Sequence, residues 1–347
     1  MILVPQEVGV SSILVADDTL AGFINDHNRF RRNSLMKALE QFEIFDDEFE
    51  KAIGPNPKLN LLVEGLAFAE GVCWIPAQNK VIVSDIPNNR IVSWSELEGF
   101  DIYREPSGCA NGNTVDNEGR VLSCLTRGRA VIREEHDGTI VTIADSFNGG
   151  KLTSPNDVAV KSDGSIWFTD PDYGFLHPEL GHGEIPEQDR NRVFRVDPET
   201  LDISLVSEDF DKPNGITFSP DESILYIGDT GRTHGEFRPH QLMAFDVKLD
   251  RLENPRLFTE VNPYVPDGFR ADTDGNIWVA VGDGVQVFSP TGTLMGKIHT
   301  PEVAANLSFG MSDNQTLFIG ATSSIWSIEL NAAGATRPQP SLSLIHI

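Results

Sequence analysis

The chain has 347 residues, of which 39% are hydrophobic and 23% charged, and its formal net charge is −25. This length indicates one large domain or two small ones, with ample apolar content for a large core. The acidic surplus argues against nucleic acid or an anionic membrane as a partner, because both are bound by clustered Lys and Arg. It indicates an acidic, solubilising surface and does not by itself identify a metal protein.

No apolar run reaches the roughly 18 residues expected of a membrane-spanning helix. Residues 1–5 lack the basic start and long apolar stretch of a secretion signal. We therefore expect a cytoplasmic protein that is a monomer or a homodimer. Cys73, Cys109 and Cys124 are odd in number and match no zinc or redox spacing, so we expect buried free thiols.

Residues 1–59 are expected to form a short, partly helical extension packed on the main domain. Asn33-Ser34 could cap a helix, with an apolar face at Leu35, Met36, Leu39 and Phe42. The acidic residues 46–50 could extend that helix or begin another turn, and the Gly-Pro-Asn-Pro sequence at 54–57 then breaks the pattern.

From residue 60 to 331 a short pattern recurs six times. Each copy starts on an acid or amide side chain: Glu70, Asn111, Asn156, Asn214, Asp267 and Asn306. A turn follows each start, at 78–79, 118–119, 163–164, 222–223, 274–275 and 313–314. An apolar strand comes next, as at Ile166-Trp167-Phe168, and further strands such as Arg192–Asp197 complete several units. Residues 332–347 remain as a C-terminal tail.

The spacings of the six starts are 41, 45, 58, 53 and 39 residues. A period near 40 to 50 with several short strands per unit is typical of a β-propeller blade. The sequence therefore predicts an all-β, six-bladed β-propeller. The two long spacings locate insertions at 173–191 and 230–240, each after the second strand of its blade, and loops of this length are often functional.

The six starts are predicted to meet at one end of the channel, because equivalent residues of a closed ring lie at equivalent heights. Two carboxylates and several amides, with no His or Cys, suit Ca²⁺, which binds oxygen ligands. Zinc or copper would prefer nitrogen or sulfur. Taken singly, the Asn-Gly and Asp-Gly dipeptides are more simply explained as turn formers. Turn formation does not explain why six acid or amide residues recur in the same register, or why one of them is Glu.

Several segments resemble those of the SMP-30/gluconolactonase/luciferin-regenerating enzyme family, and they occur in the same order. They are Glu70–Trp74, Ser154–Asp157, Thr169–Gly174, Lys212–Gly215 and Val265–Gly268. The similarity extends over residues 60–330 and is greatest to bacterial and fungal gluconolactonase-like lactonases. The family is a six-bladed propeller with a channel Ca²⁺. This chain departs from it at Val72, where Pro is common, and at Ser154, where the animal lactonases carry Arg, so their substrate preference cannot be transferred.

The resemblance implies Glu70, Asn156, Asn214 and Asp267 as metal ligands, with Asp267 also the general base. It implies Asn156 as a substrate contact supported from behind by Asp157. Asn111 and Asn306 then become pocket or turn positions, with Asn111 a candidate substrate contact. Mg²⁺, Mn²⁺ or Zn²⁺ are possible substitutes for Ca²⁺.

The expected reaction is hydrolysis of a sugar-acid lactone such as gluconolactone. The cation would bind the carbonyl oxygen, and Asp267 would take a proton from water and return one to the leaving ring oxygen. The metal should hold the pKa of Asp267 low, which makes it a weak base, but lactones are reactive. Direct attack by Asp267 is an alternative that the sequence leaves open.

Side chains of the two insertions are candidate pocket walls: Tyr173 and His177 in the first, and His234 in the second. Exposure is the simpler expectation for the histidines. A polar wall would favour sugar lactones, and an apolar wall would favour organophosphate triesters or lipophilic lactones. A calcium-binding or ligand-binding propeller without turnover is the remaining alternative, against which Asp267 argues.

Overall fold

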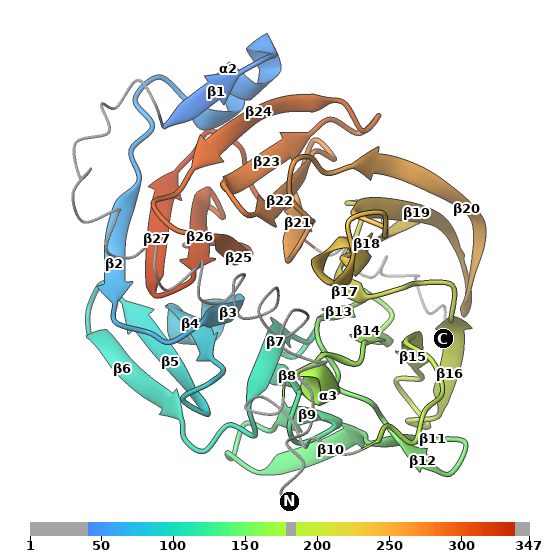
Figure 1. The fold of residues 1–347 in the computed structure, drawn as a ribbon. Coiled ribbons are helices and arrows are strands. Elements are labelled where there is room, and N and C mark those ends of the chain that lie inside the picture. Colours follow the sequence, from blue (N-terminus) through green and yellow to red (C-terminus); the bar gives the residue numbers. More distant parts are fainter. Residues whose placement is uncertain (1–40, 178–184, 337–347) are drawn as a thin grey trace, which may run out of the picture. The chain divides into compact units, whose positions relative to one another are not determined.

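The computed structural model describes residues 41–177 and 185–336. The chain divides between Phe42 and Glu43 into two units, and almost all described residues belong to the second. That unit confirms the predicted all-β propeller: six antiparallel sheets of four or five strands are arranged in a ring (Figure 1).

In the first three blades the chain runs from the innermost strand outward. Blade 1 comprises β3 (Ala69–Ile75), β4 (Lys80–Asp85), β5 (Arg90–Ser95) and β6 (Gly99–Arg104). Blade 2 comprises β7 (Ala110–Val115), β8 (Val121–Leu125), β9 (Ala130–Glu134) and β10 (Ile140–Ala144), followed by the hairpin β11 (Ser146–Phe147) and β12 (Gly150–Lys151). Blade 3 comprises β13 (Val158–Val160), β14 (Ile166–Asp170), β15 (Arg192–Val196) and β16 (Ile203–Ser207).

The last three blades follow the same order. Blade 4 comprises β17 (Pro213–Phe218), β18 (Ile224–Asp229), β19 (Gln241–Lys248) and β20 (Arg251–Glu260). Blade 5 comprises β21 (Phe269–Ala271), β22 (Ile277–Val281), β23 (Gly284–Phe288) and β24 (Leu294–His299). Blade 6 comprises β25 (Ala304–Gly310), β26 (Thr316–Ala321) and β27 (Ser324–Glu329).

Blade 6 takes its outer strand from the other end of the chain, which closes the ring. Strand β2 (Asn60–Glu64) pairs antiparallel with β27, from Asn60 opposite Ser327 to Glu64 opposite Ser324. The end of β1 (Phe42–Ile44) lies on the outer edge of β24, where the Phe45 N–H donates to Met295 O at 2.9 Å. Residues 43–64 therefore fasten blades 5 and 6.

The predicted helix at 33–42 lies mostly outside the described residues, but its last position is wrong. Phe42 is the first residue of the strand β1 and is not helical. The acidic run instead begins a new helix, α2 (Asp47–Ile53), in which the Asp46 carboxylate accepts the Glu48 N–H at 2.8 Å. As predicted, the helix ends at Gly54. The buried Phe49 ring lies 6.3 Å from that of Trp278.

All six predicted turns follow the innermost strands, and each contains a residue with positive φ. These residues are Asn79, Gly119, Gly164, Glu222, Gly275 and Asn314, with φ from 50° to 87°. Asn and Gly tolerate this conformation at low cost, so the turn sequences terminate the inner strand at the same point in each blade.

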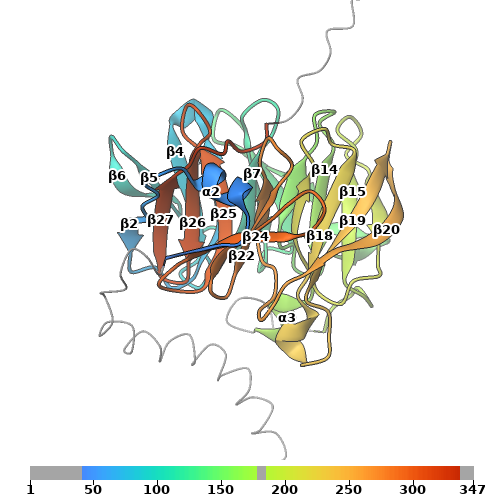
Figure 2. The same ribbon diagram turned by 90° about the horizontal axis from the view of Figure 1, so that it is seen from above.

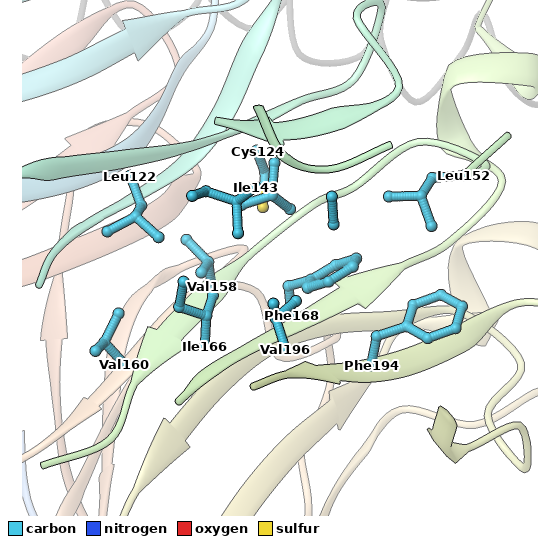
Figure 3. Close-up of a cluster of buried hydrophobic side chains, with 12 residues drawn as sticks. Leu122, Cys124, Ile143, Leu152, Val158, Val160, Ile166, Phe168, Phe194 and Val196 are labelled. Atoms are coloured by element: carbon cyan, nitrogen blue, oxygen red, sulfur yellow. The ribbon is translucent and has the colours of Figure 1, made fainter. Parts of the chain in front are cut away.

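The hydrophobic core lies between neighbouring blades. One cluster joins Leu122 and Cys124 of blade 2 to Phe168 and Phe194 of blade 3 (Figure 3). Second strands such as β14 and β22 are buried along their whole length, which explains their nearly continuous apolar sequences. All three cysteines are buried and free, as expected. Within the described ranges, no helix is long and apolar enough to cross a membrane.

Candidate functional site

The six starts of the repeat lie at or just before the beginning of the innermost strands. In four of these strands the pairing register shifts beside the start residue: at Glu70, Asn111, Asn214 and Asn306. Such β-bulges bend a strand and redirect its side chains. A β-bulge therefore recurs at four of the positions that the sequence predicted to lie at the channel.

Contacts between neighbouring blades show that the six starts form a closed ring. The Gly112 N–H donates to Asn156 O at 2.7 Å, and Asn306 Nδ2 donates to Glu70 Oε2 at 3.2 Å, which joins the last blade to the first. At Gly71 (φ 55°) an added Cβ would lie 1.8 Å from Asn111 O. Blade 1 therefore approaches blade 2 so closely that only glycine fits.

Glu70 and Asp267 are the two carboxylates of the ring. Glu70 is 5% exposed, and its Oε2 also accepts the Gly71 N–H at 3.0 Å, whereas Oε1 accepts no hydrogen bond from any described residue. Burial raises the pKa of both groups, and the negative charge of Glu70 raises that of Asp267 further. The charged form of Asp267 is therefore disfavoured both by burial and by the nearby Glu70 carboxylate.

The two amide candidates flank this pair. Asn214 is 8% exposed and its side chain hydrogen-bonds Asp267, which opposes the rise in the pKa of that carboxyl. Asn156 is 6% exposed, and its N–H donates to Thr169 O at 2.9 Å. Both amides are therefore held at the ring by main-chain and side-chain hydrogen bonds.

The Asp157 carboxylate connects two neighbouring blades. Its Oδ1 accepts the Val158 N–H at 2.9 Å and its Oδ2 the Ile216 N–H at 3.4 Å, so it bridges blades 3 and 4. Arg270 of blade 5 lies 3.6 Å from the same carboxylate. Burial raises the pKa of Asp157, and Arg270 opposes that rise. Sequence reasoning did not identify Arg270, because its strand lies two blades away from Asp157.

Three further aspartates, which sequence reasoning missed, hold the loops that lead into the ring. Each ends a second strand and accepts two consecutive main-chain N–H groups. Asp85 binds residues 67–68, Asp170 binds 153–154 and Asp229 binds 211–212, at 2.7 to 3.3 Å. The sequence signal that could have identified these three residues is the recurrence of Asp at the end of the second strand of a blade.

The two insertions meet at the ring end of the propeller, since Pro213 pairs with Asp229 and places the chain after β18 beside Asn214. The helix α3 (Tyr173–Leu176) projects from this face (Figure 2). The ring of His234, in the 3-10 turn η3 (Gly231–His234), lies 5.8 Å from that of Tyr173 and 6.3 Å from that of His177. Tyr173 is near enough to Asp267 for that charge to contribute to its raised pKa, whose main cause is burial. We call residues 172–177 with 230–238 the lip, and residues 178–184 lie outside the described residues.

Within the part of the chain that the structure describes, no group of three or more His, Cys, Asp or Glu side chains is placed to hold a metal. The ring instead combines two carboxylates with amides. Asn111 also belongs to it: its carbonyl accepts the Ser84 hydroxyl at 2.7 Å. Asn306, which the sequence assigned to a pocket or turn, contacts Glu70 directly.

Residues 68–323 match the SMP-30/Gluconolactonase/LRE-like family. The chain belongs to this family. Among similar proteins is a gluconolactonase of Zymomonas mobilis, 26% identical over 310 residues that cover 84% of this chain and 86% of the relative. A pentonolactonase of Haloferax volcanii is 24% identical over 258 residues, covering 72% and 80%. A solved gluconolactonase of Xanthomonas campestris is 33% identical with a TM-score of 0.79, covering 84% of this chain and 95% of that one.

Proposed function

We propose that this protein is a hydrolase that opens lactones of sugar acids, such as gluconolactone, with the help of a divalent cation, most suitably Ca²⁺. The observation that carries the proposal is the ring, in which the Asp267 carboxyl interacts with the buried Glu70 and is hydrogen-bonded by Asn214. The activities named for the relatives from Zymomonas mobilis and Haloferax volcanii support a lactone as the reacting group.

The residues present fit a hard cation. Glu70, Asn156, Asn214 and Asp267 would hold it, and all four offer oxygen, which Ca²⁺ prefers. Burial raises the pKa of both carboxylates, and the charge of Glu70 raises that of Asp267 further, so a divalent cation would stabilise their charged forms. When bound, the cation would supply polarisation of the lactone carbonyl and stabilisation of the developing negative charge.

Asp267 is proposed as the general base. It lies beside Asn214, whose hydrogen bond orients the carboxylate. It would take a proton from water as the new carbon–oxygen bond forms. It would then return a proton to the ring oxygen as the lactone bond breaks, giving the open hydroxy acid. Asp157, which lies 3.6 Å from Arg270, would keep the strands behind it in place.

The polar lip favours a sugar lactone over an organophosphate or a lipophilic lactone. Tyr173, Thr233 and His234 present hydroxyl and imidazole groups, and the buried Lys212 Nζ lies 2.6 Å from Asp172 Oδ1. Polar groups of this kind can form further hydrogen bonds with the hydroxyls of a sugar lactone, whereas a lipophilic substrate offers them none.

The test is a pH-indicator hydrolysis assay on aldonolactones and organophosphates, with and without EDTA. Wild type is compared with Asp267→Asn and with Asp274→Asn, a matched change in an exposed turn at the opposite end of blade 5. We expect aldonolactone hydrolysis that both EDTA and Asp267→Asn abolish and that Asp274→Asn retains. Hydrolysis that survives both chelation and Asp267→Asn would contradict the mechanism.

A further inference from the structure

The lip is a connected network rather than two separate loops. The Asp172 carboxylate of the first insertion pairs with Lys212 at 2.6 Å, and Asn191 at the end of that insertion donates to Asp211 O at 2.5 Å. Arg238 of the second insertion forms a two-point ion pair with Asp211. Blade 4 therefore holds both insertions, and the side chains that they present to the ring are pre-organised.

The direction of each hydrogen bond around Tyr173 follows from the acceptors. The Thr230 hydroxyl lies 3.1 Å from Lys212 O, and because a carbonyl only accepts, Thr230 donates. The Tyr173 hydroxyl contacts the same Thr230 oxygen and therefore donates to it. The hydroxyl proton of Tyr173 is already used in this hydrogen bond within the lip, so Tyr173 does not donate a hydrogen bond to a substrate.

The same reasoning fixes the tautomer of His234. The Thr233 hydroxyl lies 2.8 Å from Thr230 O and so donates its single proton to that carbonyl. His234 Nδ1 lies 2.7 Å from the same hydroxyl oxygen and must supply the proton of this second bond. In the neutral imidazole, Nε2 is then an unprotonated acceptor, and no described residue hydrogen-bonds it.

The surroundings of His234 favour its neutral form. Burial lowers its pKa, as do the positive charges of Lys212, His177 and Arg238, and only Asp172 opposes them. The ring is half-buried and packs against Tyr173 at 5.8 Å, so its orientation is restricted. His234 therefore offers a fixed acceptor at the ring end of the propeller.

We propose that His234 Nε2 accepts a hydrogen bond from a hydroxyl group of the lactone, which makes His234 a determinant of specificity for hydroxylated lactones over unsubstituted ones. This inference rests on the proposed lactonase function. The substrate hydroxyl is recognised by the lone pair of His234 Nε2. A side chain that can only donate a hydrogen bond at this position should therefore not replace the imidazole.

The experiment measures kcat/KM for glucono-δ-lactone and for δ-valerolactone, which lacks the hydroxyls. In His234→Phe the packing against Tyr173 is kept and the acceptor is lost, so the preference for the hydroxylated lactone should fall about tenfold. In His234→Gln, Oε1 can stand where Nε2 was, and much of the preference should return. His240→Phe is the control: its Nδ1 contacts Val261 O at 2.8 Å at the base of the same insertion, and the preference should stay at the wild-type value.

Equal loss on both lactones in His234→Phe, or no recovery in His234→Gln, would overturn the assignment of His234 while leaving the lactonase function intact. If wild type hydrolyses neither lactone, the proposed function itself fails, and the assignment fails with it. Loss of selectivity in His240→Phe would show that the insertion as a whole, not His234 Nε2, sets the preference.

Discussion

The ring and the lip lie at the same end of the propeller but have different origins. The ring consists of equivalent residues of six blades: a turn with a positive-φ residue follows every inner strand, and four of the six starts lie beside a β-bulge. The lip consists of two insertions that interrupt the repeat, and it is held by unique contacts such as Asp172–Lys212 and Asp211–Arg238. The chemistry is therefore built into the fold, whereas selectivity can change in the insertions without disturbing the ring.

The largest expected effect concerns the ring. Asp267→Asn removes the proposed base and one of the two carboxylates, so kcat for an aldonolactone should fall by about 100-fold to 10,000-fold. Steady-state kinetics measures this, and the far-ultraviolet circular dichroism should stay at the wild-type value because the Asp267 N–H to Ala280 O bond remains. A loss below about tenfold would remove Asp267 from the mechanism.

The next effect concerns Asp229, which connects the ring to the lip. The Asp229 carboxylate accepts N–H groups of Asp211, Lys212 and Gly231, so it holds both the entry to Asn214 and the start of η3. Asp229→Ala should lower the free energy of unfolding by about 2–4 kcal/mol, because buried N–H groups lose a charged acceptor.

Asp85→Ala is the matched control for Asp229→Ala, since Asp85 fills the equivalent place in blade 1, away from the lip. Denaturant unfolding should show a similar loss for both variants. Only Asp229→Ala should also change the preference between hydroxylated and unsubstituted lactones. An unchanged substrate preference in Asp229→Ala would show that the contacts of Asp229 do not determine how the lip selects substrates.

A smaller effect depends on pH. Burial raises the pKa of Asp170 to about 7 from an ordinary value of 3.8. The native state therefore holds this proton to higher pH than the unfolded chain, and its stabilising contribution is lost as pH rises through about 7. The stability of wild type should fall between pH 5 and pH 7 more steeply than that of Asp170→Asn, by at most about 1.4 kcal/mol per pH unit. Parallel slopes in denaturant titrations would contradict this.

The smallest effect concerns the lip alone. Tyr173→Phe removes the hydrogen bond to Thr230, which should cost about 0.5–1.5 kcal/mol of unfolding free energy. KM for gluconolactone should rise severalfold while kcat changes less, because the hydroxyl positions the lip and is not a reacting group. A large fall in kcat with no change in KM would instead assign Tyr173 to the reaction.

The repeat made the fold and the ring predictable. Spacing alone located all six turns, the inner strands and the convergence of Glu70 with Asp267, because equivalent positions in a closed ring must be neighbours. The Glu70–Asn306 bond follows from the same ring, although the sequence assigned Asn306 elsewhere. Arg270 was not predictable, because the strand alternation does not show which side chain crosses the channel to Asp157.

The sequence predicts where the lip lies but not the contacts within it. Its two insertions follow the second strands of neighbouring blades, as predicted, and so must lie near each other. The contact of His177 with His234, and the tautomer that Thr233 imposes on His234, depend on the path of each loop. No periodicity constrains that path.

Calorimetry of Ca²⁺ binding to chelator-treated protein shows whether the ring holds a cation. We expect one Ca²⁺ per chain for wild type and for Asp274→Asn, and binding at least about 100-fold weaker in Glu70→Gln and Asp267→Asn, since each removes a charged ligand. Restoration of gluconolactone hydrolysis should follow the same titration. Full hydrolysis by wild type without any bound cation, or equal Ca²⁺ affinity in all four proteins, would contradict this expectation.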